Sequence, residues 1–278
     1  MPSCRCVFVF AMWVALCLLC ASVSLWFFGW MGENSKFEIP LRATLRAVRQ
    51  ELLNKRSAEI QGMFGRIAHR YDLLNRVLSL GRDVSWRRVV AQRVAAARPN
   101  LVLDVCTGTG DLALGIGDGS VVGTDFCLPM LELAKRKIVD RGSRIPLFAA
   151  DALRLPVADG AIDVVTVAFG VRNFSDLGVG LGELVRALRP GGILLVLEFS
   201  RPKGPAAPIL GWWARNVPPR IGRVLSGDSE AYSYLPASVS TFADSAEMCR
   251  QLADAGLDQI CARALTGGVV TLYEGVRP

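Results

Sequence analysis

Short apolar runs alternate with helical patterns over most of the chain after residue 100. Runs of Val, Ile and Leu are each followed by a stretch with apolar residues at helical spacing, as a parallel sheet with crossover helices requires. The predicted strands cover residues 101–105, 121–125, 146–149, 162–168, 193–199, 258–264 and 269–274. Gly267 and Gly268 separate the last two, and such a connection is typical of a hairpin. The pattern therefore predicts an α/β fold with a seven-stranded, mostly parallel sheet, an antiparallel last strand and helices on both faces.

The N-terminal part of the chain follows a different pattern. No charged residue occurs from residue 6 to residue 32, and this run is long enough to span a bilayer as a helix. The basic residues that follow it favour a cytoplasmic location for the rest of the chain. We predict a transmembrane anchor over residues 1–32. A cleaved signal peptide and a translation start at Met31 or Met63 are the alternatives.

Residues 33–60 are basic and amphipathic. Leu41, Leu45, Val48 and Leu52 recur at helical spacing among Lys and Arg, which predicts a linker helix that lies on a surface. Basic residues of this kind bind anionic lipid, although a solvated, partly packed helix fits the pattern equally well. Residues 61–278 are predicted to form the globular domain.

Composition excludes several classes of protein. The chain has 278 residues, of which 51% are hydrophobic and 21% charged, and a net charge of +7. Its single histidine, His69, excludes a metal site built on two histidines, and the cysteines after residue 20 lack zinc spacing, so no metal site is predicted. Basic residues are mixed with acidic ones and do not alternate with aromatic ones, which argues against nucleic-acid binding.

A glycine-rich turn follows the first predicted strand. Asp104 lies near the end of this strand, and Gly108, Thr109 and Gly110 lead into a predicted helix. Such a turn lets the backbone approach a nucleotide-like ligand closely. The spacing alone also fits the fingerprint of dinucleotide-binding proteins.

Acidic residues lie at the ends of three successive predicted strands. Asp125 is placed to accept both hydroxyls of a ribose, and Asp151 with the adjacent Ala152 suits the edge of an adenine. Three carboxylates disfavour a pyrophosphate and favour a cationic group near Asp104, which indicates S-adenosylmethionine. Taken singly, each aspartate is explained as well by a helix N-cap or a turn. A nicotinamide-dependent oxidoreductase of the same architecture is the alternative.

Separated motifs occur in one order along the chain. They are Phe64-x-x-Ile67-Ala68-x-Arg70-Tyr71-Asp72-Leu73-Leu74-Asn75, Leu103-Asp104-Val105-Cys106-Thr107-Gly108-Thr109-Gly110-Asp111, Phe169-Gly170-Val171-Arg172-Asn173-Phe174, Leu188-Arg189-Pro190-Gly191-Gly192, Leu197-Glu198-Phe199-Ser200-Arg201-Pro202 and Tyr232-x-Tyr234-Leu235-Pro236. With them, residues 63 to 274 resemble the C-methyltransferases of menaquinone and ubiquinone biosynthesis. The resemblance implies a Rossmann-like class I methyltransferase fold with S-adenosylmethionine as cofactor.

The reaction that the resemblance implies is methyl transfer to a ring carbon of a prenylated quinol. Demethylmenaquinol, which gives menaquinol, is the expected acceptor. The methoxylated polyprenyl benzoquinol of ubiquinone synthesis is the alternative acceptor, and a non-catalytic, membrane-anchored protein that only binds the cofactor is a further alternative. No oligomeric state is predicted.

The resemblance also assigns roles by position. Thr109, Asp125, Asp151 and Ala152 would contact the cofactor, while Asp104 and the Gly108–Gly110 turn would shape its methionine end. Because the acceptor carbon becomes nucleophilic when a quinol hydroxyl loses its proton, a base or a group that holds the quinolate is needed. The candidates lie in the matched motifs and are His69, Tyr71, Asp72, Arg172, Asn173 and Tyr232.

Arg172 has two interpretations at this stage. Its guanidinium would stabilise a quinolate, but a salt bridge or a backbone contact in the loop explains it equally well. The chain also departs from the family, since Leu74 replaces the usual methionine, Asp83 a frequent histidine and Ala168 a frequent serine. No catalytic histidine is therefore carried over to position 83.

An insoluble prenyl tail would give the N-terminal features a role. An anchor or a basic amphipathic helix would hold the enzyme at the cytoplasmic face of the membrane, where quinols and cytosolic S-adenosylmethionine meet. Trp212 and Trp213 lie in a Pro- and Gly-rich excursion, where they would form either an apolar mouth for the tail or ordinary packing over the sheet.

Overall fold

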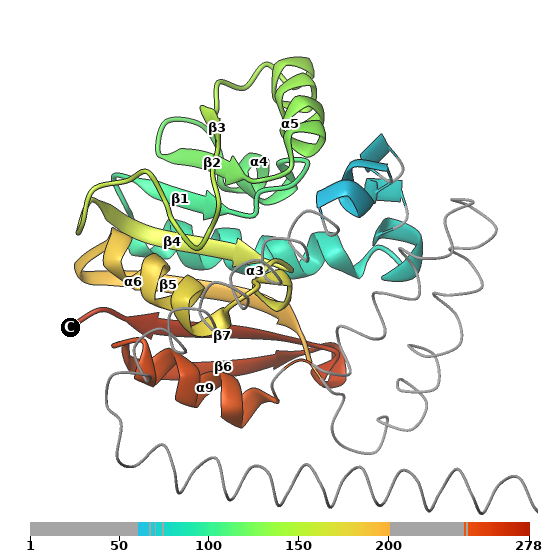
Figure 1. Ribbon diagram of the computed structural model, residues 1–278. Helices are drawn as coiled ribbons and strands as arrows, with labels where there is room; N and C mark the ends of the chain where they lie inside the picture. The colour runs from blue at the N-terminus through green and yellow to red at the C-terminus, as the bar shows by residue number, and fades with distance from the viewer. Residues whose placement is uncertain (1–60, 67, 70, 74, 201–241, 243) are drawn as a thin grey trace, which may run out of the picture. The chain divides into compact units, whose positions relative to one another are not determined.

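A seven-stranded sheet forms the centre of the protein (Figure 1). It is seen in a computed structural model that describes residues 61–66, 68–69, 71–73, 75–200, 242 and 244–278. All of these lie in one compact unit that covers residues 56–278. The strands are β1 (Val102–Val105), β2 (Val121–Asp125), β3 (Leu147–Ala149), β4 (Ile162–Ala168), β5 (Leu188–Phe199), β6 (Asp258–Leu265) and β7 (Val270–Val276).

The strand order is β3-β2-β1-β4-β5-β7-β6. Neighbours among β1 to β5 pair in parallel, whereas β7 is antiparallel to both β5 and β6. The predicted mostly parallel sheet with an antiparallel last strand is confirmed. Since β1 pairs with β2 on one side and β4 on the other, the chain reverses its winding direction at β1. The carboxyl ends of the strands at such a point form a crevice in which α/β proteins bind ligands.

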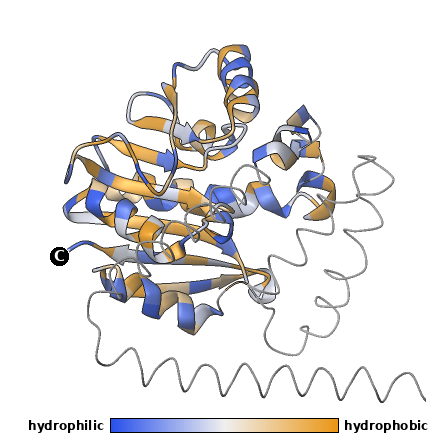
Figure 2. Cartoon of the chain, viewed as in Figure 1, coloured by the Kyte–Doolittle hydropathy of each residue, from blue (hydrophilic) through white to orange (hydrophobic). Residues whose placement is uncertain are grey.

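Helices cover both faces of the sheet because successive strand residues point to opposite sides. Leu103 and Val105 pack in one core with α6 (Leu177–Ala187) and α9 (Ser245–Asp254), whereas Val102 packs in a second core with α3 (Arg82–Ala97), α4 (Asp111–Ile116) and α5 (Leu128–Asp140). Figure 2 shows strands that are largely hydrophobic and helices that carry hydrophilic residues as well.

Local side chains mark where the helices begin. Asp176 caps α6 by accepting the N–H of Val179, and Asp244 caps α9 by accepting those of Ala246 and Glu247. Such caps satisfy N–H groups that have no partner inside the helix. The α4 helix instead begins directly after Gly110, at the end of the glycine-rich turn.

The turn predicted at residues 188–192 is in fact the first part of β5. Ile162 pairs with Leu188, but the next paired residue, Val164, faces Ile193, so the strand bulges between them. A Cβ at Gly192 would lie 2.8 Å from the Arg189 carbonyl oxygen, which explains why glycine occupies the bulge. The predicted hairpin at Gly267 is confirmed, with a 3-10 turn (Thr266–Gly268) between β6 and β7.

Several predictions fall outside the described residues. These are the anchor at 1–32, the basic helix at 33–60, the excursion with Trp212 and Trp213, and the candidate Tyr232. Among the helices that the structure describes, none is long and apolar enough to cross a bilayer.

Candidate functional site

A cavity lies at the carboxyl ends of the parallel strands. Its walls come from the segments that follow β1, β2, β3 and β4, together with two aromatic residues from the N-terminal part of the described chain, Phe64 and Tyr71. The last residues of these strands and the segments after them contribute Val105, Cys106, Gly108, Asp125, Phe126, Cys127, Ala150, Asp151, Ala152, Leu153, Ala168, Phe169, Gly170, Asn173, Phe174 and Ser175. The predicted site at this edge of the sheet thus coincides with a hollow in the molecule.

The glycine-rich turn presents bare backbone to this cavity. Gly108 has φ +56° and lines the cavity, and a Cβ built on it would meet no atom within 4 Å. A ligand can therefore approach the backbone at this point. Gly110 serves a different purpose, because its Cβ would lie 3.3 Å from the Cβ of Ala134 on α5. It allows close packing of the turn against this helix and is not part of the cavity wall.

Asp125 is held in one orientation at the end of β2. One carboxylate oxygen accepts the Gly108 N–H at 2.8 Å and the other accepts the Cys127 N–H at 2.9 Å. Burial raises the pKa of this carboxyl, although the backbone hydrogen bonds oppose the shift. A carboxylate has about four acceptor sites, so each oxygen can still accept a hydroxyl. This arrangement fits the ribose diol of S-adenosylmethionine.

Asp151 and Ala152 also line the cavity, as the sequence predicts. The Asp151 carboxylate accepts the N–H of Leu153 at 2.9 Å, which fixes the turn after β3. Phe126, Met130 and Phe174 supply apolar wall in the same cavity. A carboxylate for the sugar, an open backbone and apolar side chains for a base together match the chemistry of an adenosyl group.

Asp104 is not among the residues that line the cavity, and its expected place near the methionine end of the cofactor stays a prediction. Its carboxylate is buried and accepts the hydroxyl protons of Thr107 and Thr166, each at 2.7 Å. Burial raises its pKa to about 6 despite these two hydrogen bonds. The side chain therefore holds the start of the glycine-rich turn against β4, and the nearby Cys106 lines the cavity.

Two of the predicted catalytic residues, Tyr71 and Asn173, line the cavity. The Tyr71 ring packs edge-on against Phe64, with 5.9 Å between ring centroids.

His69 is exposed and is not part of the cavity wall. Asp72 accepts hydrogen bonds from Thr109 and Lys137 beside the cavity. Thr109, a predicted cofactor contact, is thereby engaged with Asp72 and is likewise outside the wall.

Arg172 does not face the cavity either, and the structural interpretation of this residue holds. Its guanidinium forms an ion pair with Glu198 at 2.8 Å and donates to the Phe169 carbonyl at 2.6 Å. Both side chains of the pair are almost fully buried. The guanidinium also lies over the Phe199 ring, 5.4 Å from its centroid. Arg172 therefore holds the loop after β4 in place.

Sequence reasoning missed several wall residues. Cys106 and Phe169 both have positive φ, 56° and 60°, directly after β1 and β4. Burial raises the pKa of the Cys106 thiol well above its usual value, so it stays protonated. Both residues lie in motifs quoted above without a role assigned to them, and their places immediately after predicted strands would have been a usable signal.

The sequence of the protein matches the model of one family over residues 52–277, namely the ubiE/COQ5 methyltransferase family. The chain belongs to this family. A demethylmenaquinone methyltransferase from Thermus thermophilus is 46% identical over 221 residues, which cover 78% of this chain and all of that protein. A ubiquinone/menaquinone biosynthesis C-methyltransferase from Syntrophotalea carbinolica is 44% identical over 220 residues, or 77% of this chain and 92% of that protein.

Solved structures agree with this family in fold. A SAM-dependent methyltransferase of Thermotoga maritima, described as a possible histamine N-methyltransferase, matches with a TM-score of 0.56 and 17% identity over 78% of this chain and 99% of that one. The predictions of a class I methyltransferase fold and of a methyltransferase that uses S-adenosylmethionine are confirmed. Membership of the ubiE/COQ5 methyltransferase family does not support the nicotinamide-dependent alternative.

Proposed function

We propose that the protein transfers the methyl group of S-adenosylmethionine to a ring carbon of demethylmenaquinol, which gives menaquinol. The observation that carries this proposal is the 46% identity with the demethylmenaquinone methyltransferase of Thermus thermophilus over the whole length of that protein. Relatives from Deinococcus radiodurans and Bacteroides fragilis have the same name and are 44% and 37% identical. The benzoquinol of ubiquinone synthesis remains the second acceptor, because other relatives are named for both pathways.

The residues of the cavity would divide the work of binding between them. Asp125 would accept hydrogen bonds from the ribose hydroxyls, and Asp151 and Ala152 would contact the adenine edge. Gly108, which has no side chain, would let the ligand come close to the backbone. When bound, S-adenosylmethionine supplies an electrophilic methyl group on a sulfonium. The protein's contribution to such an in-line displacement is alignment of the two reactants, which can account for much of the rate enhancement.

The acceptor oxygen would be held by Tyr71 and Asn173. These are the two predicted catalytic residues with a place on the cavity wall, and a phenol O–H and an amide N–H both donate hydrogen bonds. Donors of this kind stabilise the negative charge that develops on the quinol oxygen as its proton leaves. We retain Tyr71 and Asn173 as the residues that act on the acceptor.

The site of action would be the cytoplasmic face of a membrane. A prenylated quinol is insoluble in water, and the run without charged residues from 6 to 32 is long enough for an anchor. In this proposal residues 1–32 anchor the chain, residues 33–60 lie on the lipid surface and residues 61–278 carry out catalysis. Membrane fractionation of the full chain tests it, since recovery in the soluble fraction alone would contradict an anchor.

Methyl transfer from labelled S-adenosylmethionine tests the reaction directly. The full chain is supplied in parallel with reduced demethylmenaquinone and with the demethylated ubiquinone precursor, both in lipid vesicles. Label in the naphthoquinol alone is the expected result, and label in both quinols would assign a dual specificity. Label in neither quinol, from a protein that binds S-adenosylmethionine, would contradict the proposal.

A further inference from the structure

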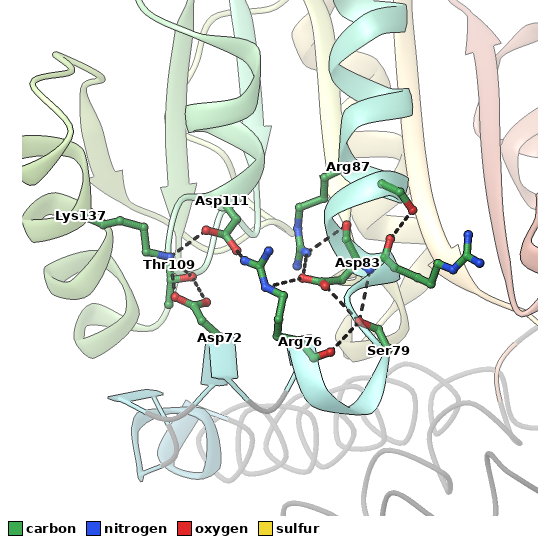
Figure 3. Close-up of polar contacts among 10 residues, drawn as sticks. Asp72, Arg76, Ser79, Asp83, Arg87, Thr109, Asp111 and Lys137 are labelled. Carbon is green, nitrogen blue, oxygen red and sulfur yellow. Dashed lines mark hydrogen bonds and ion pairs between the residues drawn. The ribbon is translucent and has the colours of Figure 1, made fainter.

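Lys137 connects three parts of the molecule beside the cavity (Figure 3). Its ammonium group on α5 lies 2.5 Å from an Asp72 oxygen, 2.8 Å from an Asp111 oxygen and 3.1 Å from the Thr109 hydroxyl. Thr109 belongs to the glycine-rich turn, and Asp111 begins α4. Asp72 belongs to residues 61–81, which we call the capping segment.

The contacts continue as an alternating series of acids and bases. The Arg76 guanidinium lies 3.6 Å from an oxygen of Asp111 and 3.8 Å from Oδ2 of Asp83. The Arg87 guanidinium lies 2.9 Å from that same Asp83 oxygen. In Figure 3 these side chains run between the capping segment and the body of the domain. Lys137 stands at the end of this series that lies nearest the glycine-rich turn.

The partners of Lys137 are sequence neighbours of cavity residues. Asp72 follows Tyr71, and Thr109 follows Gly108, and both Tyr71 and Gly108 line the cavity. The Thr109 hydroxyl also donates to Asp72 at 2.6 Å, so the two segments contact each other directly in front of the ammonium. Lys137 itself is not part of the wall. The Lys137 ammonium therefore contacts the sequence neighbours of two wall residues that come from distant parts of the chain.

A second contact holds the other end of the capping segment. The Gln61 amide donates to the Phe126 carbonyl at 2.7 Å, and Ala68 packs with Cys127 and Met130 in a small apolar cluster. This contact involves the turn between β2 and α5. The contacts of Asp72 with Thr109 and with Lys137 are instead made at the glycine-rich turn.

Charge explains why a lysine suits this position. Asp72 and Asp111 are both bonded to the one ammonium, so its removal would leave two carboxylates facing the same space. Burial alone would raise the pKa of Asp111, but the hydrogen bond and charge of Lys137, with the charges of Arg87 and Arg76, lower it overall. An apolar side chain of similar length would keep the packing and lose this attraction.

We infer that Lys137 is a positioning residue that fixes the capping segment to the glycine-rich turn and so holds Tyr71 and Gly108 together around the methyl donor. The inference deepens the proposed function, on which it rests for the identity of the donor. It requires no particular acceptor, because the effect is on binding of S-adenosylmethionine and on the capping segment itself.

The test compares Lys137→Met with Lys135→Met in the full chain. Lys135 lies on the same helix and is exposed, so its variant is a matched control for loss of a lysine. Affinity for S-adenosylmethionine is measured by calorimetry, and hydrogen exchange is followed in residues 61–81 with and without the ligand. We expect Lys137→Met to weaken binding about tenfold and to speed exchange in the capping segment, while Lys135→Met matches the wild type.

A double-mutant cycle separates positioning from a general structural role. If Lys137 acts through Asp72, adding Asp72→Asn to Lys137→Met weakens binding little further, because contacting residues are not additive. Lys137→Arg, which keeps the positive charge, is expected to bind more tightly than Lys137→Met. Strictly additive losses, or faster exchange spread evenly over the sheet strands, would overturn the inference.

The two proposals fail in different ways. Equal affinity and equal exchange for Lys137→Met and Lys135→Met would overturn the role of Lys137 and leave the methyltransfer proposal intact. Failure of the wild type to bind S-adenosylmethionine would overturn the proposed function. In that event exchange of the ligand-free proteins decides the role of Lys137, since the contact exists without ligand.

Discussion

Arg172 and Glu198 form an ion pair of 2.8 Å in which the side chains are 4% and 0% exposed. The pair joins the loop after β4, which contains Arg172, to the end of β5, which contains Glu198. The Glu198 carboxylate also accepts the Phe199 N–H. The neighbouring Asn173 lines the cavity. The pair therefore sets the position of a residue that we assign to the acceptor, without touching the acceptor itself.

Loss of one partner of this pair should be costly. Glu198→Gln leaves a buried guanidinium without its carboxylate, and such changes cost about 3 to 5 kcal/mol of folding free energy. The matched double variant Arg172→Met with Glu198→Leu removes both charges and is expected to lie much closer to the wild type. Urea unfolding of the three proteins measures this, and equal losses in the single and double variants would contradict the interpretation.

Asp125 is the residue on which we expect donor affinity to depend most. Asp125→Ala removes the acceptor for the ribose hydroxyls and should weaken binding of S-adenosylmethionine by about 10- to 100-fold, in line with about 1.5 to 3 kcal/mol for a hydrogen bond to a charged group. Calorimetry on the folded variant measures it. Asp140→Ala, at an exposed position near the end of α5, is the control. Unchanged affinity in Asp125→Ala would refute the assignment.

Asp104 makes the stability of the protein depend on pH. Its pKa is about 6 in the folded protein against 3.8 for an ordinary aspartate, so the folded state holds the proton more tightly than the unfolded one. Stability from this group is fully present below pH 4 and falls, by about 3 kcal/mol, as the pH rises towards 6. Asp104→Asn is expected to remove this fall, as measured by urea unfolding from pH 4 to 8.

Asp163 supplies the opposite case as a control. A hydrogen bond from Arg189 lowers the pKa of this carboxyl, so its stabilising contribution is present above the ordinary pKa and is lost as the pH falls. Asp163→Asn should therefore remove a rise of stability with pH. If Asp104→Asn and Asp163→Asn change the pH profile in the same direction, the account of Asp104 is wrong.

Gly170 and Cys106 are in contact at the cavity wall, which makes a reciprocal test possible. A Cβ at Gly170 would lie 2.5 Å from the Cys106 Cβ and 2.7 Å from its sulfur. Gly170→Ala should cost about 1 to 3 kcal/mol through overpacking. Adding Cys106→Gly removes the clash at a residue whose φ of 56° suits glycine, so part of the loss should return in thermal unfolding. No recovery would contradict the contact.

The strands could be predicted closely because their signal is local. Runs such as residues 162–168 are apolar and bounded by turn residues, and β4 has these same bounds. The prediction of a turn at residues 188–192 was wrong because glycine and proline are common both in turns and in strand bulges. Only the pairing of Leu188 with Ile162 on another strand makes this stretch part of the sheet.

Some residues of the site could likewise be predicted from local signals, and others could not. Gly108, Asp125 and Asp151 were predicted at the ligand edge because the carboxyl ends of parallel strands meet there, and they line the cavity. The burial of Asp104 and the choice between the two interpretations of Arg172 could not be predicted, because the direction of each side chain depends also on a distant partner, Thr166 and Glu198 respectively. Such a partner leaves no trace near the residue in the sequence.

Lys137 had no local signal at all. Its partners Asp72 and Asp111 lie 65 and 26 residues away along the chain, and a lysine near the end of an amphipathic helix is ordinary. Only the folded chain brings these three side chains together.

The two backbone N–H groups that hold the Asp125 carboxylate have a thermodynamic consequence. The rotamer freedom of this side chain is already lost when the protein folds, so binding of S-adenosylmethionine does not have to restrict it again. Affinity at this position is then governed by the backbone at Gly108 and Cys127, which orients the carboxylate. Substitutions that shift either peptide group are expected to change the affinity for S-adenosylmethionine, even where the altered side chain does not contact this ligand.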